Sequence, residues 1–234
     1  IINNDKILVT INVFEGKKYF IERINIVGNS VTEDNVIRGE LLLDEGDPYS
    51  LLLLEKSVNN IKARNIFGKV KNITYDGSSS DLKMINIEVE EKATGEIFAG
   101  AGVGSSGGTI GAGVKENNFL GRGVKLDANL SVSATAIRGR FSAVNPNYNY
   151  SGNEIRFTAQ STRTSKMTNF GYDSSKTGFS LGTTFEQYED IYISPDISSY
   201  YETLSTNDNA SKALKDQEGS FIDTELRYSI IQDK

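Results

Sequence analysis

Residues 100–108, GAGVGSSGG, contain a G-x-G-x-x-G whose glycines are Gly102, Gly104 and Gly107. This spacing is typical of dinucleotide-binding folds, in which the glycines let the backbone approach a pyrophosphate at the N-terminus of a helix. Residues 109–115, however, alternate as another strand does, and no helical pattern follows them. The motif therefore lacks the strand–turn–helix context that a phosphate site needs, and its glycines require another explanation.

The residue inventory limits the other chemistry that the chain can perform. Its 234 residues include no cysteine and no histidine. This excludes disulfides, Cys/His zinc sites, Cys–His nucleophile pairs and a Ser-His-Asp triad. A Ser–Lys dyad or a carboxylate pair remains open, but no spacing points to either. We expect no enzyme activity and no bound cofactor or metal.

The glycines fit a strand with one bare face. Apolar side chains fall on one face of this strand, at Ile97, Ala99, Ala101 and Val103, and Gly100, Gly102 and Gly104 fall on the other. Residues 105–108 then supply a hairpin connection. A strand without side chains on one face has a weakly specified register and an accessible backbone. Two interpretations stay open: the glycines make room for a plug or a bend inside a barrel, or this strand pairs reversibly with a partner.

From Thr94 onward the sequence alternates with a period of two. Residues 124–133, 137–143, 155–160 and 222–230 each place apolar side chains opposite polar or charged ones. Segments of about ten residues, separated by Gly, Asn, Asp and Ser, have the length of tilted strands that cross a bilayer. A soluble sandwich would alternate as well, but charged residues inside the strands favour a membrane barrel. No apolar run approaches the roughly 20 residues of a membrane-spanning helix.

The first part of the chain mixes helical and strand periods. We expect strands over residues 6–13 and 19–27, and then a helix that Ser30 or Thr32 caps and that includes Leu41. A second helix is predicted over residues 50–67, with Gly68 as its C-terminal cap. Strands over residues 69–75 and 82–89 follow. From residue 19 the order is β-α-α-β-β, which indicates a small α+β domain ahead of antiparallel transmembrane strands of a partial barrel.

Several runs resemble a known family. Residues 19–29, YFIERINIVGN, resemble the first strand of a POTRA domain, and the β-α-α-β-β order matches that module. Residues 91–95, the glycine strand, residues 117–123 (NNFLGRG) and Asn145-Pro146 resemble the junction and first barrel strands of the Omp85 superfamily. We therefore expect residues 1–17 to end a preceding POTRA domain, residues 18–92 to form a POTRA domain, and residues 93–234 to form the N-terminal half of an outer-membrane β-barrel, with about eight strands.

The resemblance implies a 16-stranded barrel in the bacterial outer membrane, with its POTRA domains in the periplasm, that assembles and inserts β-barrel proteins. It implies unfolded outer-membrane proteins, accessory outer-membrane lipoproteins and outer-membrane lipid as partners. A polypeptide secretion pore or a passive channel is the alternative. The net charge of −6 and the lack of a basic stripe argue against nucleic acid.

The two ends of the sequence bear on whether the chain is a whole barrel protein or part of one. The chain begins Ile1-Ile2-Asn3, without Met or a signal peptide, and it lacks the later Arg-Gly motif of the superfamily. We expect it to be a fragment; a complete chain would instead suggest a closed eight-stranded barrel.

The resemblance also assigns candidate sites. Substrate strand pairing is expected at the first barrel strand, at Thr94, Ile97, Ala99, Gly100, Ala101, Gly102, Val103 and Gly104. An edge strand of the POTRA sheet would accept an extended chain by β-augmentation, at Lys69, Val70, Lys71, Ile73 and Tyr75. Arg38 and Glu45 match positions that contact an accessory lipoprotein. The alternatives are a plain sheet edge for the former and solvated surface charges for the latter.

Overall fold

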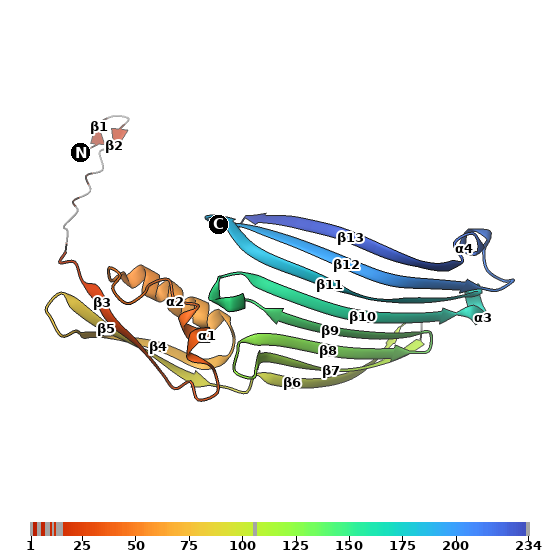
Figure 1. The fold of residues 1–234 in the computed structure, drawn as a ribbon, viewed down its shortest axis with the longest axis horizontal. Coiled ribbons are helices and arrows are strands. Elements are labelled where there is room, and N and C mark those ends of the chain that lie inside the picture. The colour runs from red at the N-terminus through yellow and green to blue at the C-terminus, as the bar shows by residue number, and fades with distance from the viewer. Residues whose placement is uncertain are drawn as a thin grey trace.

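The computed structural model describes residues 2–3, 6–7, 10, 12, 16–104 and 107–232 (Figure 1). At the start of the chain, β1 (Ile2–Asn3) pairs antiparallel with β2 (Lys6–Ile7). The strand expected over residues 6–13 therefore begins as a strand, but residues 8, 9, 11 and 13 lie outside the described residues. Its assignment to a preceding POTRA domain stays a prediction.

An α+β domain follows, with helices on one face of a three-stranded sheet (Figure 1). Its elements are β3 (Phe20–Val27), α1 (Asp34–Arg38), α2 (Leu51–Ala63), β4 (Phe67–Asp76) and β5 (Leu82–Glu91). The sheet order is β3-β5-β4; β5 is parallel to β3 and antiparallel to β4. Between sheet and helices lies one apolar core, which includes Ile24, Ile37, Leu54, Ile61 and Ile85. The predicted β-α-α-β-β order is confirmed.

The helix boundaries differ from the predicted ones for local reasons. Neither Ser30 nor Thr32 caps α1, because the residue before this helix is Glu33. The Ser30 hydroxyl donates to Glu91 instead, and the Thr32 hydroxyl accepts from the side chain of Asn118. The helix also ends before Leu41. Ser50 does cap α2, accepting a hydrogen bond from the N–H of Leu53.

The end of α2 was predicted wrongly. This helix stops at Ala63, and Asn65 takes a positive φ of 57°, which ends the helical path. Gly68 is therefore not the C-terminal cap that the sequence suggested. It lies within β4, which begins one residue before it. The residue in the left-handed conformation after α2 is Asn65, and asparagine is, after glycine, the residue that adopts this conformation most readily.

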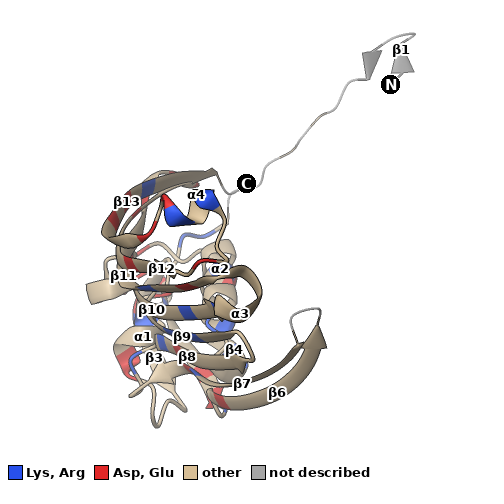
Figure 2. Ribbon diagram, turned by 90° about the vertical axis from the view of Figure 1, so that its right-hand side faces the viewer, with Lys and Arg blue, Asp and Glu red and all other residues tan. Residues whose placement is uncertain are grey.

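The rest of the chain forms one antiparallel sheet of eight strands, each paired with its neighbours in sequence. Viewed along the strands, this sheet is curved and open (Figure 2). Its strands are β6 (Gly95–Gly104), β7 (Gly107–Phe119), β8 (Val124–Ser133), β9 (Ala136–Asn145), β10 (Glu154–Lys166), β11 (Tyr172–Tyr188), β12 (Ile191–Thr206) and β13 (Gly219–Gln232). The predicted α+β domain with a partial barrel of about eight strands is confirmed.

The register gives this sheet an apolar and a polar face. Leu130 of β8 pairs with Ala112 and Gly139, and Phe141 of β9 pairs with Ala128 and Ala159, so these side chains share the apolar face. Many of its apolar side chains are exposed, such as Ile222, Leu226 and Tyr228 of β13. The polar face contains the intervening residues. A period-two sequence folds this way because successive side chains of a strand point to opposite faces.

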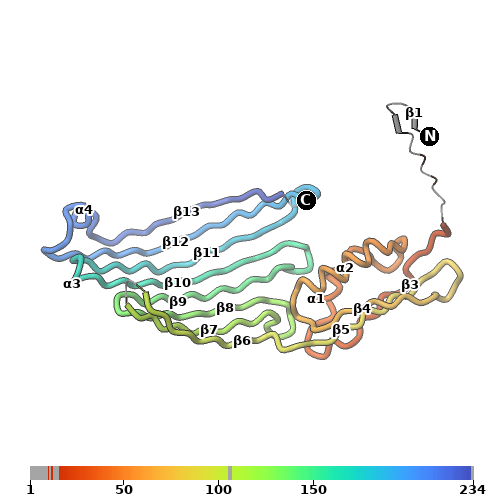
Figure 3. Tube along the Cα trace, turned by 180° about the vertical axis from the view of Figure 1, so that it is seen from behind, coloured from red at the N-terminus to blue at the C-terminus, as the bar shows by residue number. Residues whose placement is uncertain are grey.

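The connections from β7 to β8, from β9 to β10 and from β11 to β12 lie at the end of the sheet beside α1 (Figure 3). The connection from β9 to β10 contains the 3-10 helix η1 (Tyr148–Tyr150). At the opposite end, α3 (Met167–Phe170) follows β10 and α4 (Lys212–Lys215) follows β12. None of the helices in the described part of the chain is long and apolar enough to cross a membrane.

Candidate functional site

The glycine strand β6 lies at an edge of the eight-stranded sheet. Among the described strands it pairs only with β7, from Gly95↔Glu116 to Gly104↔Gly107. All of its residues are exposed. It contains the predicted strand-pairing residues Ile97, Ala99, Gly100, Ala101, Gly102, Val103 and Gly104. The eighth, Thr94, directly precedes the strand, and its carbonyl oxygen accepts a hydrogen bond from the N–H of Asn117 at 3.2 Å. One side of this backbone is therefore open to another strand.

Packing does not explain the three glycines of β6. No described atom lies within 4 Å of the position that a Cβ would take at Gly100, Gly102 or Gly104. None of the three has a positive φ. Gly113 of β7 is different, because a Cβ there would overlap the ring of Phe98. Glycine is thus sterically required at position 113, whereas the described surroundings would accept a side chain at each of the three β6 positions.

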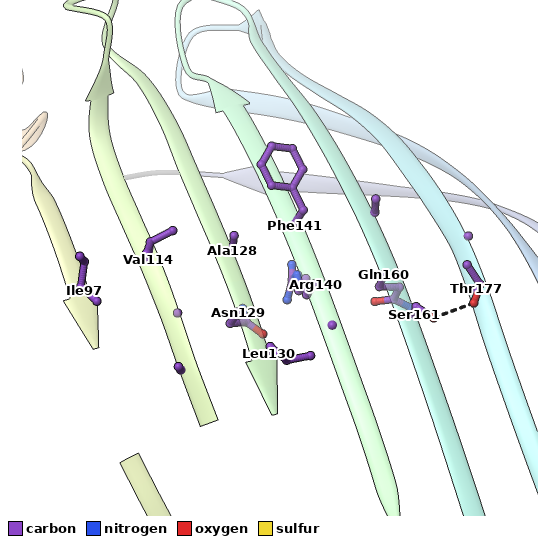
Figure 4. Close-up of a pocket in the computed structure, with 15 residues that line it drawn as sticks. Ile97, Val114, Ala128, Asn129, Leu130, Arg140, Phe141, Gln160, Ser161 and Thr177 are labelled. Atoms are coloured by element: carbon purple, nitrogen blue, oxygen red, sulfur yellow. Dashed lines mark hydrogen bonds between the residues drawn. The ribbon is translucent and has the colours of Figure 1, made fainter. Parts of the chain in front are cut away.

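A groove crosses the apolar face beside β6 (Figure 4). Small side chains of β7 to β11 form its floor, and Ile97, Leu130 and Phe141 border it. The hydroxyl oxygens of Ser161 and Thr177 lie 2.8 Å apart and share a hydrogen bond there. The residues that line the groove include no acid, so they offer no acid–base pair. The surface is instead shallow and largely apolar, which suits contact with acyl chains.

The second predicted site, β4, is an edge of the three-stranded sheet. It contains Lys69, Val70, Lys71, Ile73 and Tyr75, and among the described strands it pairs only with β5. The opposite edge, β3, is covered by the loop that precedes α2. In that cover, Ile21 donates its N–H to the Asp47 carbonyl at 2.9 Å and accepts from the N–H of Gly46 at 2.7 Å. Of the two edges, β4 is therefore the accessible one.

The structure brings Arg38 and Glu45 together at the covered edge of β3. Glu45 accepts a hydrogen bond from the N–H of Ile24 at 2.9 Å, and the Arg38 guanidinium donates to the Ile24 carbonyl at 2.9 Å. The two side chains lie 3.8 Å apart as an ion pair, and Arg38 also pairs with Asp34 at 2.7 Å. Both remain partly exposed. They are therefore not free surface charges, and their contact with a lipoprotein stays a prediction.

Sequence reasoning missed the role of Glu91 at the end of β5. Its carboxylate accepts hydrogen bonds from the backbone N–H groups of Ser30, Val31 and Thr32, the shortest at 2.6 Å, and from the Ser30 hydroxyl at 2.7 Å. Burial raises the pKa of Glu91, but the hydrogen bonds from Thr32 and Ser30 outweigh it and lower the pKa to about 2. This carboxylate stays ionised and holds residues 30–32 against the end of β5.

Asn118, on the neighbouring strand β7, was also missed as a contact residue. It is buried, with 6% of its surface exposed. Its side-chain N–H donates to the Thr32 hydroxyl at 2.8 Å, and its side-chain oxygen accepts from the N–H of Gly123 at 2.7 Å. The only sequence signal was its place in the run NNFLGRG. The eight-stranded sheet and the α+β domain are thus joined by a buried hydrogen bond between Asn118 and Thr32.

Both parts of the chain match known protein families. Residues 19–92 match POTRA, described as surface antigen variable number repeat, and residues 118–234 match the Omp85 superfamily domain, which alone covers half of the chain. The chain belongs to the Omp85 superfamily. Along this chain the POTRA match precedes the Omp85 match, as the α+β domain precedes the eight-stranded sheet in the structure.

Individual relatives agree with this membership. The outer membrane protein assembly factor BamA of Neisseria meningitidis serogroup B is 29% identical over 147 residues, which are 61% of this chain and 18% of that protein. The matched segment therefore covers less than a fifth of that relative.

Solved structures show the same fold. The structure of BamA from Haemophilus ducreyi lacking POTRA domains 1-3 superposes with a TM-score of 0.71 at 20% identity, over 92% of this chain and 43% of that one. CdiB from Escherichia coli gives a TM-score of 0.59 at 12% identity, over 91% of this chain and 41% of that one. At these identities the likeness concerns the fold alone.

Membership of the Omp85 superfamily also gives the cellular location of this chain. It belongs to the outer membrane of the bacterial cell, with the POTRA domain in the periplasm. The turn between β7 and β8, which contacts the POTRA domain, therefore lies at the periplasmic end of the sheet. The connections that contain α3 and α4 lie at the opposite, outer end.

Proposed function

We propose that this chain is part of an assembly factor that inserts β-barrel proteins into the outer membrane, and that β6 is the strand on which substrate strands are formed. The observation that supports this proposal best is the glycine face of β6. The strand lies at a sheet edge, and neither the packing of the described residues nor backbone conformation requires its three glycines. The name of the N. meningitidis relative, an outer membrane protein assembly factor, agrees with it.

The energetics of strand edges in lipid explain what such a strand would do. Each backbone N–H or C=O left unpaired in hydrocarbon costs several kcal/mol, so a nascent barrel cannot expose an open edge to the bilayer. A weakly sealed β6 would pair with that edge until the substrate closes. The glycines of β6 keep this pairing reversible, because few side chains on that face fix the register between the two strands. Strand pairing and burial of apolar surface supply the free energy, so no covalent chemistry and no cofactor is needed.

The other candidate sites fit around this strand. The accessible edge β4 would receive unfolded outer-membrane proteins in extended form by β-augmentation. Arg38 and Glu45, partly exposed beside β3, would contact an accessory outer-membrane lipoprotein. The apolar groove beside β6 would hold acyl chains of outer-membrane lipid. Each of these partners is inferred from chemistry and position.

Replacing Gly100, Gly102 and Gly104 together with Val tests the proposal. Valine favours the extended, paired strand by up to about 1 kcal/mol per position, so we expect barrel insertion by the full-length protein to slow by about tenfold or more. Insertion of a radiolabelled barrel protein into proteoliposomes would measure this rate. The matched control is Gly111→Val on the same face of β7, where an added Cβ makes only ordinary contacts.

The outcomes separate the two function classes. A slowed rate in the triple variant with a normal rate in the control supports templating by β6. An unchanged rate in the triple variant contradicts it. If the triple variant instead alters conductance of the protein and leaves insertion unchanged, the result favours a secretion pore or channel with the same fold.

A further inference from the structure

The turn between β7 and β8 is docked against the POTRA domain. Asn118 opens this segment, and its buried side chain bridges two partners: it donates to the Thr32 hydroxyl at 2.8 Å and accepts from the N–H of Gly123 at 2.7 Å. The backbone of the turn adds a contact of its own, because the Gly121 carbonyl accepts the N–H of Glu33 at 2.8 Å. The N–H of Glu33 is one of the groups that a helix N-terminus leaves unpaired.

The two glycines of the turn fit the POTRA surface closely. Gly121 has a φ of 74°, and a Cβ there would overlap the carbonyl oxygen of Val31. Gly123 has a φ of 65°, and a Cβ there would overlap the guanidinium of Arg64. Gly152, in the next periplasmic turn, has a similar φ of 76° but faces open space. Close approach to the POTRA domain, and not only the turn geometry, thus requires glycine at 121 and 123.

Two side chains of the POTRA domain, Arg64 and Glu91, stabilise its side of the contact. Arg64 at the end of α2 donates to the Gly123 carbonyl at 2.8 Å and lies 3.6 Å from Glu40. This pair is largely buried, which raises the pKa of Glu40 and lowers the pKa of Arg64. Glu91 holds residues 30–32 from the end of β5, only a few residues before β6 begins. Residues 30–33 therefore lie between the strand that leads into β6 and the turn that follows β7.

We infer that Asn118, Gly121 and Gly123 form a clasp that fixes the POTRA domain at the periplasmic end of β6. The clasp fixes the orientation of β5, and therefore of the start of β6, relative to β7. The POTRA edge strand β4 and the barrel edge strand β6 then move together as one rigid unit. Its members are positioning residues: they contact no substrate and act by orienting the strands that do. This role rests on the function proposed for β6.

Distance measurements between the two domains test the clasp. Spin labels on cysteines placed at Lys56 of α2 and Lys212 of α4, in full-length protein in proteoliposomes, report the docking of the POTRA domain. We expect one narrow distance distribution in the parent. Asn118→Ala leaves a buried hydroxyl and an N–H unpaired, and Gly121→Ala forces the domains apart, so each variant should raise the undocked population by about tenfold.

Matched controls isolate the contact. Asn117→Ala removes a neighbouring amide that has no side-chain hydrogen bond to the described residues of the POTRA domain. Gly107→Ala adds a side chain at a positive φ of 99° at the opposite end of the sheet, where the nearest described contact is an ordinary 3.9 Å from Ala134. Both should keep the narrow distribution. Heat-modifiable migration on gels checks that every barrel is folded. If the turn variants fail to fold, Arg64→Met removes the contact to Gly123 from the POTRA side and serves as the test.

Insertion of a barrel substrate is measured in the same vesicles. Undocking together with a several-fold slower insertion supports the inference. An unchanged distance distribution in Asn118→Ala and Gly121→Ala overturns the clasp, and undocking with a normal insertion rate overturns its positioning role. If the parent itself inserts no substrate, the proposed function fails, while the distances still decide whether the clasp exists.

Discussion

At the residue scale, single polar side chains organise the junction between the two domains. Glu91 accepts hydrogen bonds from three backbone N–H groups and one hydroxyl. Asn118 forms hydrogen bonds both to the POTRA domain and to the turn after β7. The sequence placed both in runs that resemble the superfamily but gave them no role. Asn118 and Thr32 are 86 residues apart, and no local pattern predicts a side-chain contact over that separation.

The depressed pKa of Glu91 predicts a local pH dependence. Its pKa of about 2 in the folded chain lies below the ordinary value of 4.5, so the carboxylate contributes stability above pH 4.5 and loses it as the pH falls from 4.5 towards 2. We expect a loss of about 1–2 kcal/mol for residues 30–32, less than the full shift implies, because the carboxylate is partly open to solvent. Hydrogen exchange at Val31 and Thr32, corrected for intrinsic rates, measures it.

A variant provides the reference for this titration. Glu91→Gln cannot ionise, so the exchange of the same two amides should be faster than in the parent near neutral pH and should not change between about pH 5 and pH 2. Parent protection that stays constant over this interval would show that Glu91 does not hold the segment.

At the element scale, the alternating strands were predictable and the ends of the helices were not. Period-two alternation is local, so most of the barrel strands and their two faces could be predicted, whereas no range was predicted for β12. The start of α1 depended on competition for side-chain hydrogen bonds, because the Ser30 hydroxyl binds Glu91 and the Thr32 hydroxyl binds Asn118. After α2, Asn65 has the left-handed conformation that the sequence suggested for a glycine. The sequence likewise did not predict that the loop before α2 covers β3 and leaves β4 as the accessible edge.

That cover predicts a stability role for Arg38 and Glu45. Arg38→Ala removes a charged hydrogen bond to the Ile24 carbonyl and leaves Glu45 without its ion-pair partner. We expect a loss of about 1 kcal/mol in the free energy of unfolding, and a coupling of about 0.5 kcal/mol with Glu45→Ala in a double-mutant cycle. Urea unfolding of the POTRA transition in the full-length protein measures both.

Lys56→Ala on the exposed face of α2 is the control, and it should leave the transition unchanged. If Arg38→Ala and Glu45→Ala also leave it unchanged, the two residues do not stabilise β3, and any loss of lipoprotein binding in these variants reflects a direct contact. If they destabilise the domain, binding data for them must be compared at equal folded fraction.

At the scale of the whole molecule, two sheets with accessible edges are joined end to end. The strand β5 of the POTRA sheet leads within a few residues into β6 of the barrel sheet, and the turn after β7 closes the junction from the other side. An extended substrate received at β4 would thus arrive close to the periplasmic end of β6. Under the proposed function, this geometry would bring an unfolded chain received at β4 close to the strand on which its first barrel strand forms.

The central claim is that β6 pairs with substrate strands, and disulfide crosslinking tests it most directly. The chain has no cysteine of its own, so a single cysteine at Ala101, in the middle of β6, can be introduced into the full-length protein. Its partners are cysteines scanned along the edge strands of a nascent barrel substrate, and a cysteine in the last strand of the protein's own barrel serves as the control. We predict crosslinks to one edge strand of the substrate, in a defined register, during insertion. Crosslinks to the protein's own last strand alone, while the substrate is inserted normally, would contradict the account.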